Sequence, residues 1–136
     1  MKKIGLVLLV DDNADDNFFH TKAIQKSGVA QSVAECHNGI EALNFLLRKE
    51  ESNDNYPRPD LIFLDINMPK MNGWEFLEEY EKLAENVKGG PVIVMLTTSI
   101  NPRDEEKVKK YNVMKGFLKK PLRVHDIEKI MDEYFQ

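Results

Sequence analysis

The chain has 136 residues, and 42% of them are apolar, which is enough to build the core of one domain of ordinary size. Its formal net charge of -4 at pH 7 disfavours a nucleic-acid-binding surface. The one cysteine, Cys36, cannot form an internal disulfide, so we expect it to be a small buried residue in a protein of a reducing compartment, the cytoplasm.

The first apolar run, residues 4–10, is too short for a membrane helix, which needs about 20 apolar residues, and no signal-peptide cleavage site follows it. It is typical of a strand that is covered on both faces. The amphipathic residues 14–27 predict the first helix, and Gly28 stands where a helix can end. Residues 32–36 and 40–48 predict a second strand and a second helix.

The rest of the chain continues this alternation. The polar residues 49–59, which end with two prolines, predict an exposed loop and not a domain boundary. Further strands are predicted at residues 61–64, 92–96 and, more weakly, 116–118, and further helices at residues 74–84, from Asn101-Pro102 onward, and at 124–135. The pattern indicates an α/β fold: a doubly wound, five-stranded parallel sheet with helices on both faces, built as one domain over residues 1–136.

Polar side chains follow the predicted strands where each strand ends. Asp11 and Asp12 follow the first strand, Asp65 the third, Thr97 the fourth and Lys120 the fifth. Because ligands of such folds bind at the carboxyl ends of the strands, we expect these side chains to meet at one edge of the sheet. Each of them alone is equally typical of a solvated loop, a turn or a strand, so it is their joint placement that indicates a site.

Three carboxylates in one place repel one another unless a cation lies among them, and Mg2+ prefers oxygen ligands of this kind. Asp12 and Asp65 can each supply a carboxylate and Asn67 a backbone carbonyl, while Asp11 can orient a metal-bound water. The histidines lack the spacing of a metal site, and we expect them to be unrelated surface or helix residues; His20, on the first helix, is a candidate for a partner contact.

Asp65 can also act as a nucleophile, because carboxylates form aspartyl-phosphate intermediates in enzymes. Charge that develops on the transferred phosphoryl group would be stabilised by a metal ion, the Lys120 ammonium and the Thr97 hydroxyl. Spacing alone does not distinguish these roles from those of a surface lysine and an ordinary strand threonine.

Four motifs at the strand ends resemble the receiver domain of two-component response regulators. They are Leu-Val-Asp-Asp-Asn at 9–13, Asp-Ile-Asn-Met-Pro-Lys-Met-Asn-Gly at 65–73, Leu-Thr-Thr-Ser at 96–99 and Lys-Lys-Pro at 119–121. Each motif is weak alone, but the four together, in this order and spacing, are specific, and the resemblance covers nearly the whole chain. It implies a CheY-like, flavodoxin-like strand order 2-1-3-4-5 and a sensor histidine kinase as partner.

The resemblance implies that Asp65 is the phosphoacceptor, that Asp12 and the Asn67 carbonyl bind Mg2+ directly, and that Asp11 completes the acid pair. It also implies that the protein catalyses only its own phosphorylation and dephosphorylation, as part of a phosphorelay, and is otherwise not an enzyme. We therefore expect no membrane or nucleic-acid contact in its function.

The resemblance further implies how the switch works. Lys120 would contact the phosphoryl oxygens and precede a cis bond to Pro121, Thr97 would move toward the phosphoryl group, and Phe117 would then swing inward. Thr98 stands where the family usually has a smaller residue, and its side chain would narrow the access of water to Asp65. Asn67 and Ser99 would border the path of that water.

The long 49–59 loop and the Leu-Thr-Thr-Ser motif are similar to small receivers that partner with bacterial phytochrome kinases. The chain ends at Gln136, just after the last predicted helix, so we expect a stand-alone receiver without a DNA-binding domain. Output would use a downstream protein, a homodimer through the helices near 102–110 and 124–135, or transfer of the phosphoryl group to a partner histidine. The sequence does not choose among these.

Three other functions compete with this interpretation. A phosphohydrolase with an aspartate nucleophile typically carries an acid two residues later, where this chain has Asn67. A nucleotide-binding module of similar topology would carry a glycine-rich loop after a strand, and none is present. A degenerate receiver that only binds proteins would have lost one of the acids or the lysine.

Overall fold

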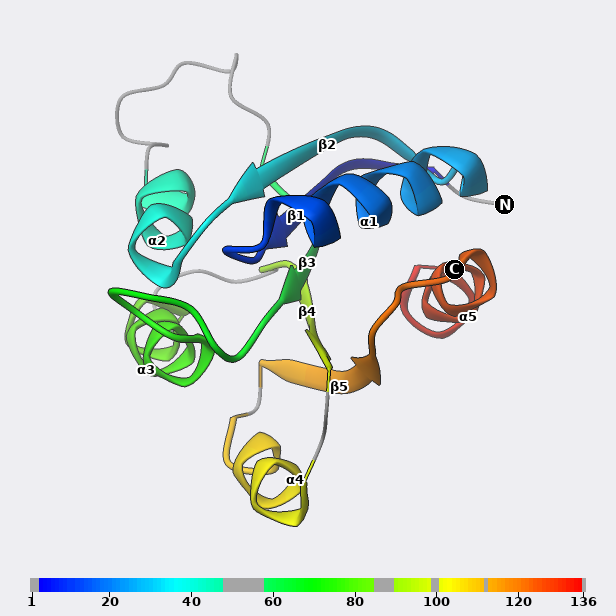
Figure 1. Ribbon diagram of the computed structural model, residues 1–136. Coiled ribbons are helices and arrows are strands. Elements are labelled where there is room, and N and C mark those ends of the chain that lie inside the picture. The colour runs from blue at the N-terminus through cyan, green and yellow to red at the C-terminus, as the bar shows by residue number, and fades with distance from the viewer. Residues whose placement is uncertain (1–2, 48–57, 85–89, 99–100, 112, 136) are drawn as a thin grey trace.

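The computed structural model describes residues 3–47, 58–84, 90–98, 101–111 and 113–135. The chain alternates strictly between strands and helices (Figure 1). The strands are β1 (Ile4–Val10), β2 (Ala30–Cys36), β3 (Leu61–Leu64), β4 (Val92–Thr97) and β5 (Met114–Lys119). The helices are α1 (Ala14–Ser27), α2 (Gly39–Leu47), α3 (Gly73–Ala84), α4 (Pro102–Val108) and α5 (Val124–Tyr134).

The five strands form one parallel sheet in the order β2-β1-β3-β4-β5, which confirms the predicted fold class and strand order. The order reverses direction between β1 and β3, because the chain first builds outward to β2 and then returns past β1. Such a switch point opens a crevice at the carboxyl ends of β1 and β3, where this class of fold binds ligands.

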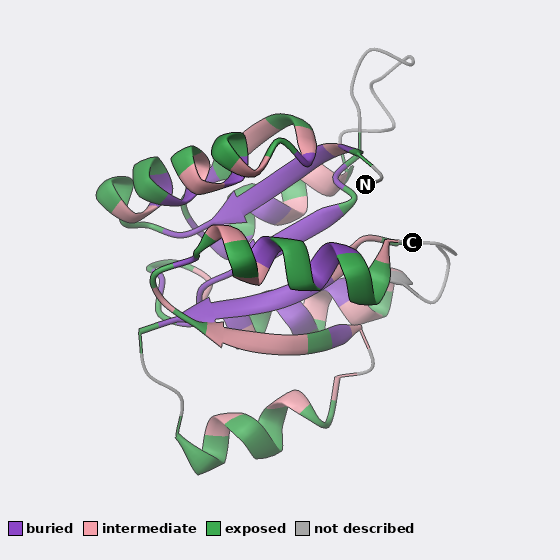
Figure 2. Ribbon diagram, turned by 90° about the vertical axis from the view of Figure 1, so that its right-hand side faces the viewer, coloured by how far each residue is buried: buried purple, intermediate pink, exposed green. Residues whose placement is uncertain are grey.

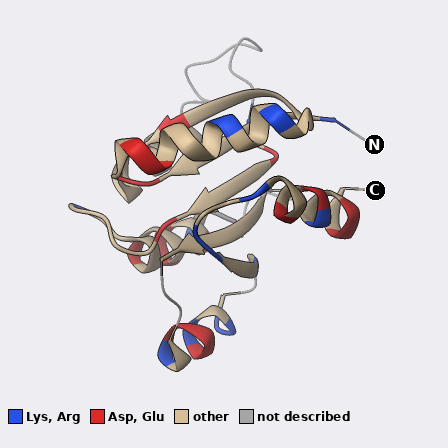
Figure 3. Cartoon of the chain, turned by 45° about the vertical axis from the view of Figure 1, so that its right-hand side comes forward, with Lys and Arg blue, Asp and Glu red and all other residues tan. Residues whose placement is uncertain are grey.

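Helices α1 and α5 lie on one side of the sheet and α2 and α3 on the other (Figure 1). A hydrophobic cluster of buried residues lies on each of the two faces. Alternate residues of each central strand point to opposite faces, so Val7 and Leu9 lie with α1 and α5, while Leu8 and Val10 lie with α2 and α3. Because both faces are buried, the central strands are apolar except for Thr97 at the end of β4, and Figure 3 shows the acidic and basic residues mainly on the helices. Among the described residues, no helix is both long and apolar enough to cross a membrane.

Capping residues end α1 and begin α4 where the sequence predicts. Gly28 closes α1 with a φ of 71°, a conformation that glycine adopts without strain. Asn101 caps α4, with Pro102 in the first turn. The largest differences are in the edge strands: β2 begins at Ala30 instead of residue 32, and β5 spans 114–119 instead of 116–118, while β4, α2, α3 and α5 differ from their predicted limits by one residue. Pairing with a neighbouring strand, and not hydrophobicity, sets these limits.

Helix α4 is the helix with the weakest attachment to the core. None of its residues is buried, and Figure 2 shows it standing below the sheet with most of its surface exposed. Its last turn packs through Val108, and the loop that follows packs through Tyr111, which stacks on Trp74 of α3 at 6.1 Å between ring centroids. An element with so few buried contacts is the one that moves at the lowest free-energy cost.

Gly73 allows the chain to pass close behind Asp65. Its backbone N–H donates to the Ile66 carbonyl at 2.8 Å, and a Cβ at this position would overlap the Asp65 carbonyl oxygen. We expect Gly73→Ala to lower the free energy of unfolding by about 2 kcal/mol, since overpacking of this kind typically costs that amount. The control is Gly116→Ala in β5, where a Cβ would meet no atom within 4 Å and the change should be within about 0.5 kcal/mol. Urea denaturation of both variants measures the difference, and equal midpoints would show that the close approach is not needed.

Candidate functional site

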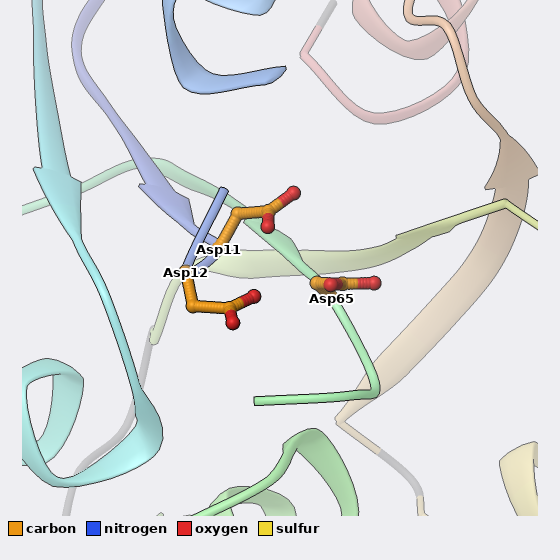
Figure 4. A group of neighbouring side chains, drawn as sticks. All are labelled: Asp11, Asp12 and Asp65. Carbon is orange, nitrogen blue, oxygen red and sulfur yellow. The ribbon is translucent and has the colours of Figure 1, made fainter. Parts of the chain in front are cut away.

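Backbone hydrogen bonds fix two acids side by side at the edge of the sheet. The Asp11 N–H donates to the Cys36 carbonyl at 3.0 Å, and the Asp65 N–H donates to the Val10 carbonyl at 2.9 Å. The ladder therefore continues one residue past the ends of β1 and β3. One carboxylate oxygen each of Asp11, Asp12 and Asp65 lies within 4.8 Å of the other two. Figure 4 shows the three side chains as neighbours. The predicted convergence of the three acids is confirmed.

The electrostatics of this acid cluster favour a bound cation. Asp11 and Asp65 are buried and Asp12 is exposed. Burial and then the nearby Asp11 carboxylate raise the pKa of Asp65 to about 6, although Lys120 opposes the shift. Two buried acids and one that faces solvent provide the oxygen ligands that a hard divalent ion prefers, with one side left open for water or phosphate oxygens. These residues therefore fit a Mg2+ ion.

Lys120 lies in the same cluster, on the segment after β5. Its Nζ is 2.6 Å from Asp11 Oδ2, 2.8 Å from Asp16 Oδ2 and 3.7 Å from Asp65 Oδ2. Burial lowers the pKa of Lys120, but the hydrogen bonds with Asp11 and Asp16 outweigh this and raise it. The peptide bond to Pro121 is cis, as the resemblance implied. An ammonium that is charged at neutral pH thus lies beside Asp65, the candidate nucleophile.

The remaining predicted site residues surround this centre to different degrees. Thr97 ends β4, is buried, and accepts a backbone hydrogen bond from Lys120 N–H at 2.7 Å. Phe117 on β5 is half-buried against the cluster that α2 and α3 cover. Asn67 and Thr98 are exposed beside the site, while Ser99 and residues 49–57 of the predicted loop lie outside the described part of the chain. Their assigned roles stay predictions.

The sequence analysis missed Asp16, and it misplaced His20. Asp16 reaches Lys120 from the first turn of α1, although such acids usually serve only the helix end. His20 lies on the helix, as expected, but it is only 3% exposed, so the expected contact with a partner is wrong. It lines a small recess behind Asp11 and Asp65 together with Asn17, and burial lowers its pKa. The 3.6-residue periodicity, which places residue 20 one turn from 16 and 17 and on the same face as 24, was the available signal.

The raised pKa of Asp65 should make the free energy of unfolding depend on pH. Below about pH 4 the carboxyl is protonated in both the folded and the unfolded chain. Between pH 4 and about 6 the unfolded chain has lost this proton while the folded chain still holds it, so the folded state becomes less stable as the pH rises. This loss of stability is complete near pH 7. In the absence of metal, we expect Asp65→Asn to be more stable than the wild type by about 2 kcal/mol at pH 7.5 and by much less at pH 4.5.

Chemical denaturation of both proteins at the two pH values, with chelator present, measures this difference. A stability difference that is the same at both pH values would show that folding does not raise the pKa of Asp65.

Comparison with known proteins places the chain in a family. The response regulator receiver domain matches residues 7–132. Response regulator Rcp1 of Synechocystis is 37% identical over 99 residues, which are 73% of this chain and 65% of that protein. A crystal structure of the Mn2+-bound form of Rcp1 is 30% identical with a TM-score of 0.72 and covers 96% of this chain and 93% of that one.

Two further solved structures are similar over nearly the full length. A two-component response regulator from Cytophaga hutchinsonii is 27% identical with a TM-score of 0.86, covering 97% of each chain. The bacteriophytochrome response regulator RtBRR is 26% identical with a TM-score of 0.75, covering all of this chain and 80% of that one. Receiver domains are signalling proteins of two-component phosphorelays and, as a class, not enzymes. The chain belongs to the receiver-domain family of response regulators.

Proposed function

We propose that this receiver accepts a phosphoryl group on Asp65 from a sensor histidine kinase in a Mg2+-dependent reaction, and that it signals by a change of conformation. The observation that carries the proposal is the meeting of three carboxylates and one lysine at the switch point of the sheet. Of the three acids in the cluster, Asp65 alone is both buried and more than 3.5 Å from Lys120. Its carboxylate oxygen is therefore the one that can attack a phosphorus atom.

The acid cluster would bind the metal ion in this proposal. Asp12 and Asp65 would supply carboxylate ligands, the Asn67 backbone carbonyl a third oxygen, and Asp11 would orient a bound water. A bound Mg2+ would supply positive charge to the phosphoryl oxygens as the transfer proceeds.

In the transfer itself, an Asp65 carboxylate oxygen attacks the phosphorus atom. The bond from phosphorus to the donor breaks, and its electron pair leaves with the donor, which is a phosphohistidine nitrogen or the carboxylate of an acyl phosphate. Lys120 and the Thr97 hydroxyl donate to the oxygens of the transferred group. Attack of water on the same phosphorus later returns Asp65 and releases inorganic phosphate, with Thr98 beside the path and limiting the access of water.

The conformational signal would travel through β4 and β5. Thr97 moves toward the phosphoryl group, and the space it leaves is filled by Phe117, which is half-buried in the structure. Helix α4, which has no buried residue, changes position most readily, so the surface of α4 and α5 is the candidate output face. A downstream protein, a second copy or a phosphotransfer partner would recognise it.

The likeness to the bacteriophytochrome response regulator supports a phytochrome-type kinase as the donor. We propose a location in the reducing cytoplasm, because the single cysteine, Cys36, cannot form an internal disulfide. We propose residues 1–136 as one receiver domain, in which the family match over 7–132 occupies nearly all of the described strands and helices.

Incubation with a small acyl phosphate and Mg2+, followed by intact-mass measurement, tests the proposal. We expect the mass of one phosphoryl group to be added to the wild type, and none when chelator replaces the metal. A wild type that gains no mass with either the acyl phosphate or a phosphorylated histidine kinase would contradict the proposal and favour a receiver that only binds proteins. Turnover of simple phosphate esters would favour the phosphohydrolase.

A further inference from the structure

Each helix carries an acid at its third position, and these acids do not all have the same partner. The carboxylates of Glu75, Asp104 and Asp126 accept a hydrogen bond from the backbone N–H of the residue that precedes their own helix, at 3.0, 3.3 and 3.1 Å. Glu41 likewise accepts from a backbone N–H just before α2, that of His37, at 3.1 Å. These four acids stabilise the start of the helix to which they belong.

Asp16, the corresponding acid of α1, differs from the other four. The backbone N–H of its N-cap residue, Asn13, donates to Asp11 Oδ1 at 2.9 Å and not to Asp16. Asp16 Oδ2 instead accepts from Lys120 Nζ at 2.8 Å, across 104 residues of sequence. The Asp16 side chain therefore contacts Lys120 in the acid cluster and does not cap its own helix.

Lys120 is consequently shared among three carboxylates. It is hydrogen-bonded to Asp11 and Asp16, and it is nearly 1 Å farther from Asp65 than from either of them (3.7 Å against 2.6 and 2.8 Å). An ammonium has three donors, so two are already in use when the third is needed by a group on Asp65. The Lys120 side chain is 9% exposed, which excludes most of the water that would screen these charges.

We propose that Asp16 is a positioning residue that competes with the phosphoryl group on Asp65 for Lys120, and thereby limits how tightly the phosphorylated state is stabilised. The inference rests on the proposed function. A phosphoryl group adds about -1.5 to -2 charges beside a cation that Asp16 already attracts. Removing the charge of Asp16 leaves more of the Lys120 interaction for the phosphoryl oxygens.

The test uses beryllofluoride, a tetrahedral anion that mimics a phosphoryl group on a carboxylate, in the presence of Mg2+. Its affinity is measured by calorimetry for the wild type, Asp16→Asn, Lys120→Met and the double variant. We expect Asp16→Asn to bind beryllofluoride about fivefold more tightly than the wild type, within the range of a charge-assisted hydrogen bond. In the Lys120→Met background the same substitution should change the affinity less than about twofold.

Asp15→Asn is the matched control, because Asp15 is the adjacent acid on α1 and forms no ion pair with Lys120 in the described structure. It removes the same charge from the same turn and should leave the affinity unchanged. This comparison still decides the question if Lys120→Met does not fold. Asp16 is 32% exposed in its side chain and Asn preserves its shape, so the fold should tolerate that change.

Equal tightening in Asp15→Asn and Asp16→Asn, or equal tightening with and without Lys120, would show simple charge repulsion and overturn the proposal. Weaker binding by Asp16→Asn would overturn it as well. Failure of the proposed function looks different: the wild type itself would then bind no beryllofluoride, or Asp65→Asn would bind it equally well.

Discussion

Lys120→Ala should slow phosphorylation of Asp65 by an acyl phosphate by about 100-fold. Lys120 Nζ lies 3.7 Å from the carboxylate of Asp65, the proposed nucleophile, and both side chains are largely buried. Removing one positioned donor from the developing charge of a transition state typically costs a factor of about 100 to 1,000. The measurement is the time course of intact-mass labelling at saturating Mg2+.

The control for this prediction is Lys119→Ala. Lys119 is the neighbouring lysine at the end of β5, it is exposed, and it forms no ion pair with any described acid. Its loss changes the net charge by the same amount and should leave the rate within about twofold of the wild type. If both variants label at the wild-type rate, Lys120 does not contact the transferred group, and the site as described is wrong.

Asp12→Asn should weaken Mg2+ binding about 100-fold and remove labelling at millimolar Mg2+. Asp12 is the exposed member of the acid cluster, so it is the carboxylate that an incoming hydrated ion meets first. A hard cation loses a charged oxygen ligand in this variant, while the amide keeps the size of the side chain. Calorimetric titration with Mg2+ measures the affinity, and intact mass measures the labelling.

Because Asp12 is exposed, this substitution should not destabilise the metal-free fold; removing one of three repelling acids should raise its stability slightly. Asp15→Asn is the control for the change in charge, because Asp15 lies outside the acid cluster. This variant should bind Mg2+ with the affinity of the wild type. Unchanged Mg2+ affinity in Asp12→Asn would contradict the assignment of the metal site.

The strands and the acids that follow them could be predicted from local patterns, whereas the strand order came from the resemblance to a receiver domain. Apolar runs covered on both faces mark β1, β3 and β4, and parallel strands place the residues that follow them at one edge. Asp11, Asp65 and Lys120 are each the residue directly after a strand, so their meeting needed only the correct strand order. The edge strands, which have solvent on one side, gave weaker patterns, and their limits were missed by one or two residues.

The parts that could not be predicted depend on contacts between distant segments. Asp16 has the sequence signature of a helix N-terminus, and only its approach to Lys120 distinguishes it from Asp104 and Asp126. His20 is polar, so its residue type favours the surface, but the helical phase that buries Ile24 also buries it. The weak attachment of α4 to the core likewise results from its lack of buried residues. Helix propensity predicts that a helix forms here, but not how much of it is buried.

Chemical trapping of the phosphorylated residue tests the central claim most directly. Borohydride reduces an aspartyl phosphate to homoserine with release of phosphate, and peptide mass mapping then locates the altered residue. After incubation with an acyl phosphate and Mg2+, we predict homoserine at position 65 and nowhere else in the chain. Homoserine at position 11, 12 or 16, or a labelled protein that yields none, would contradict the assignment of Asp65 as the residue that receives the phosphoryl group.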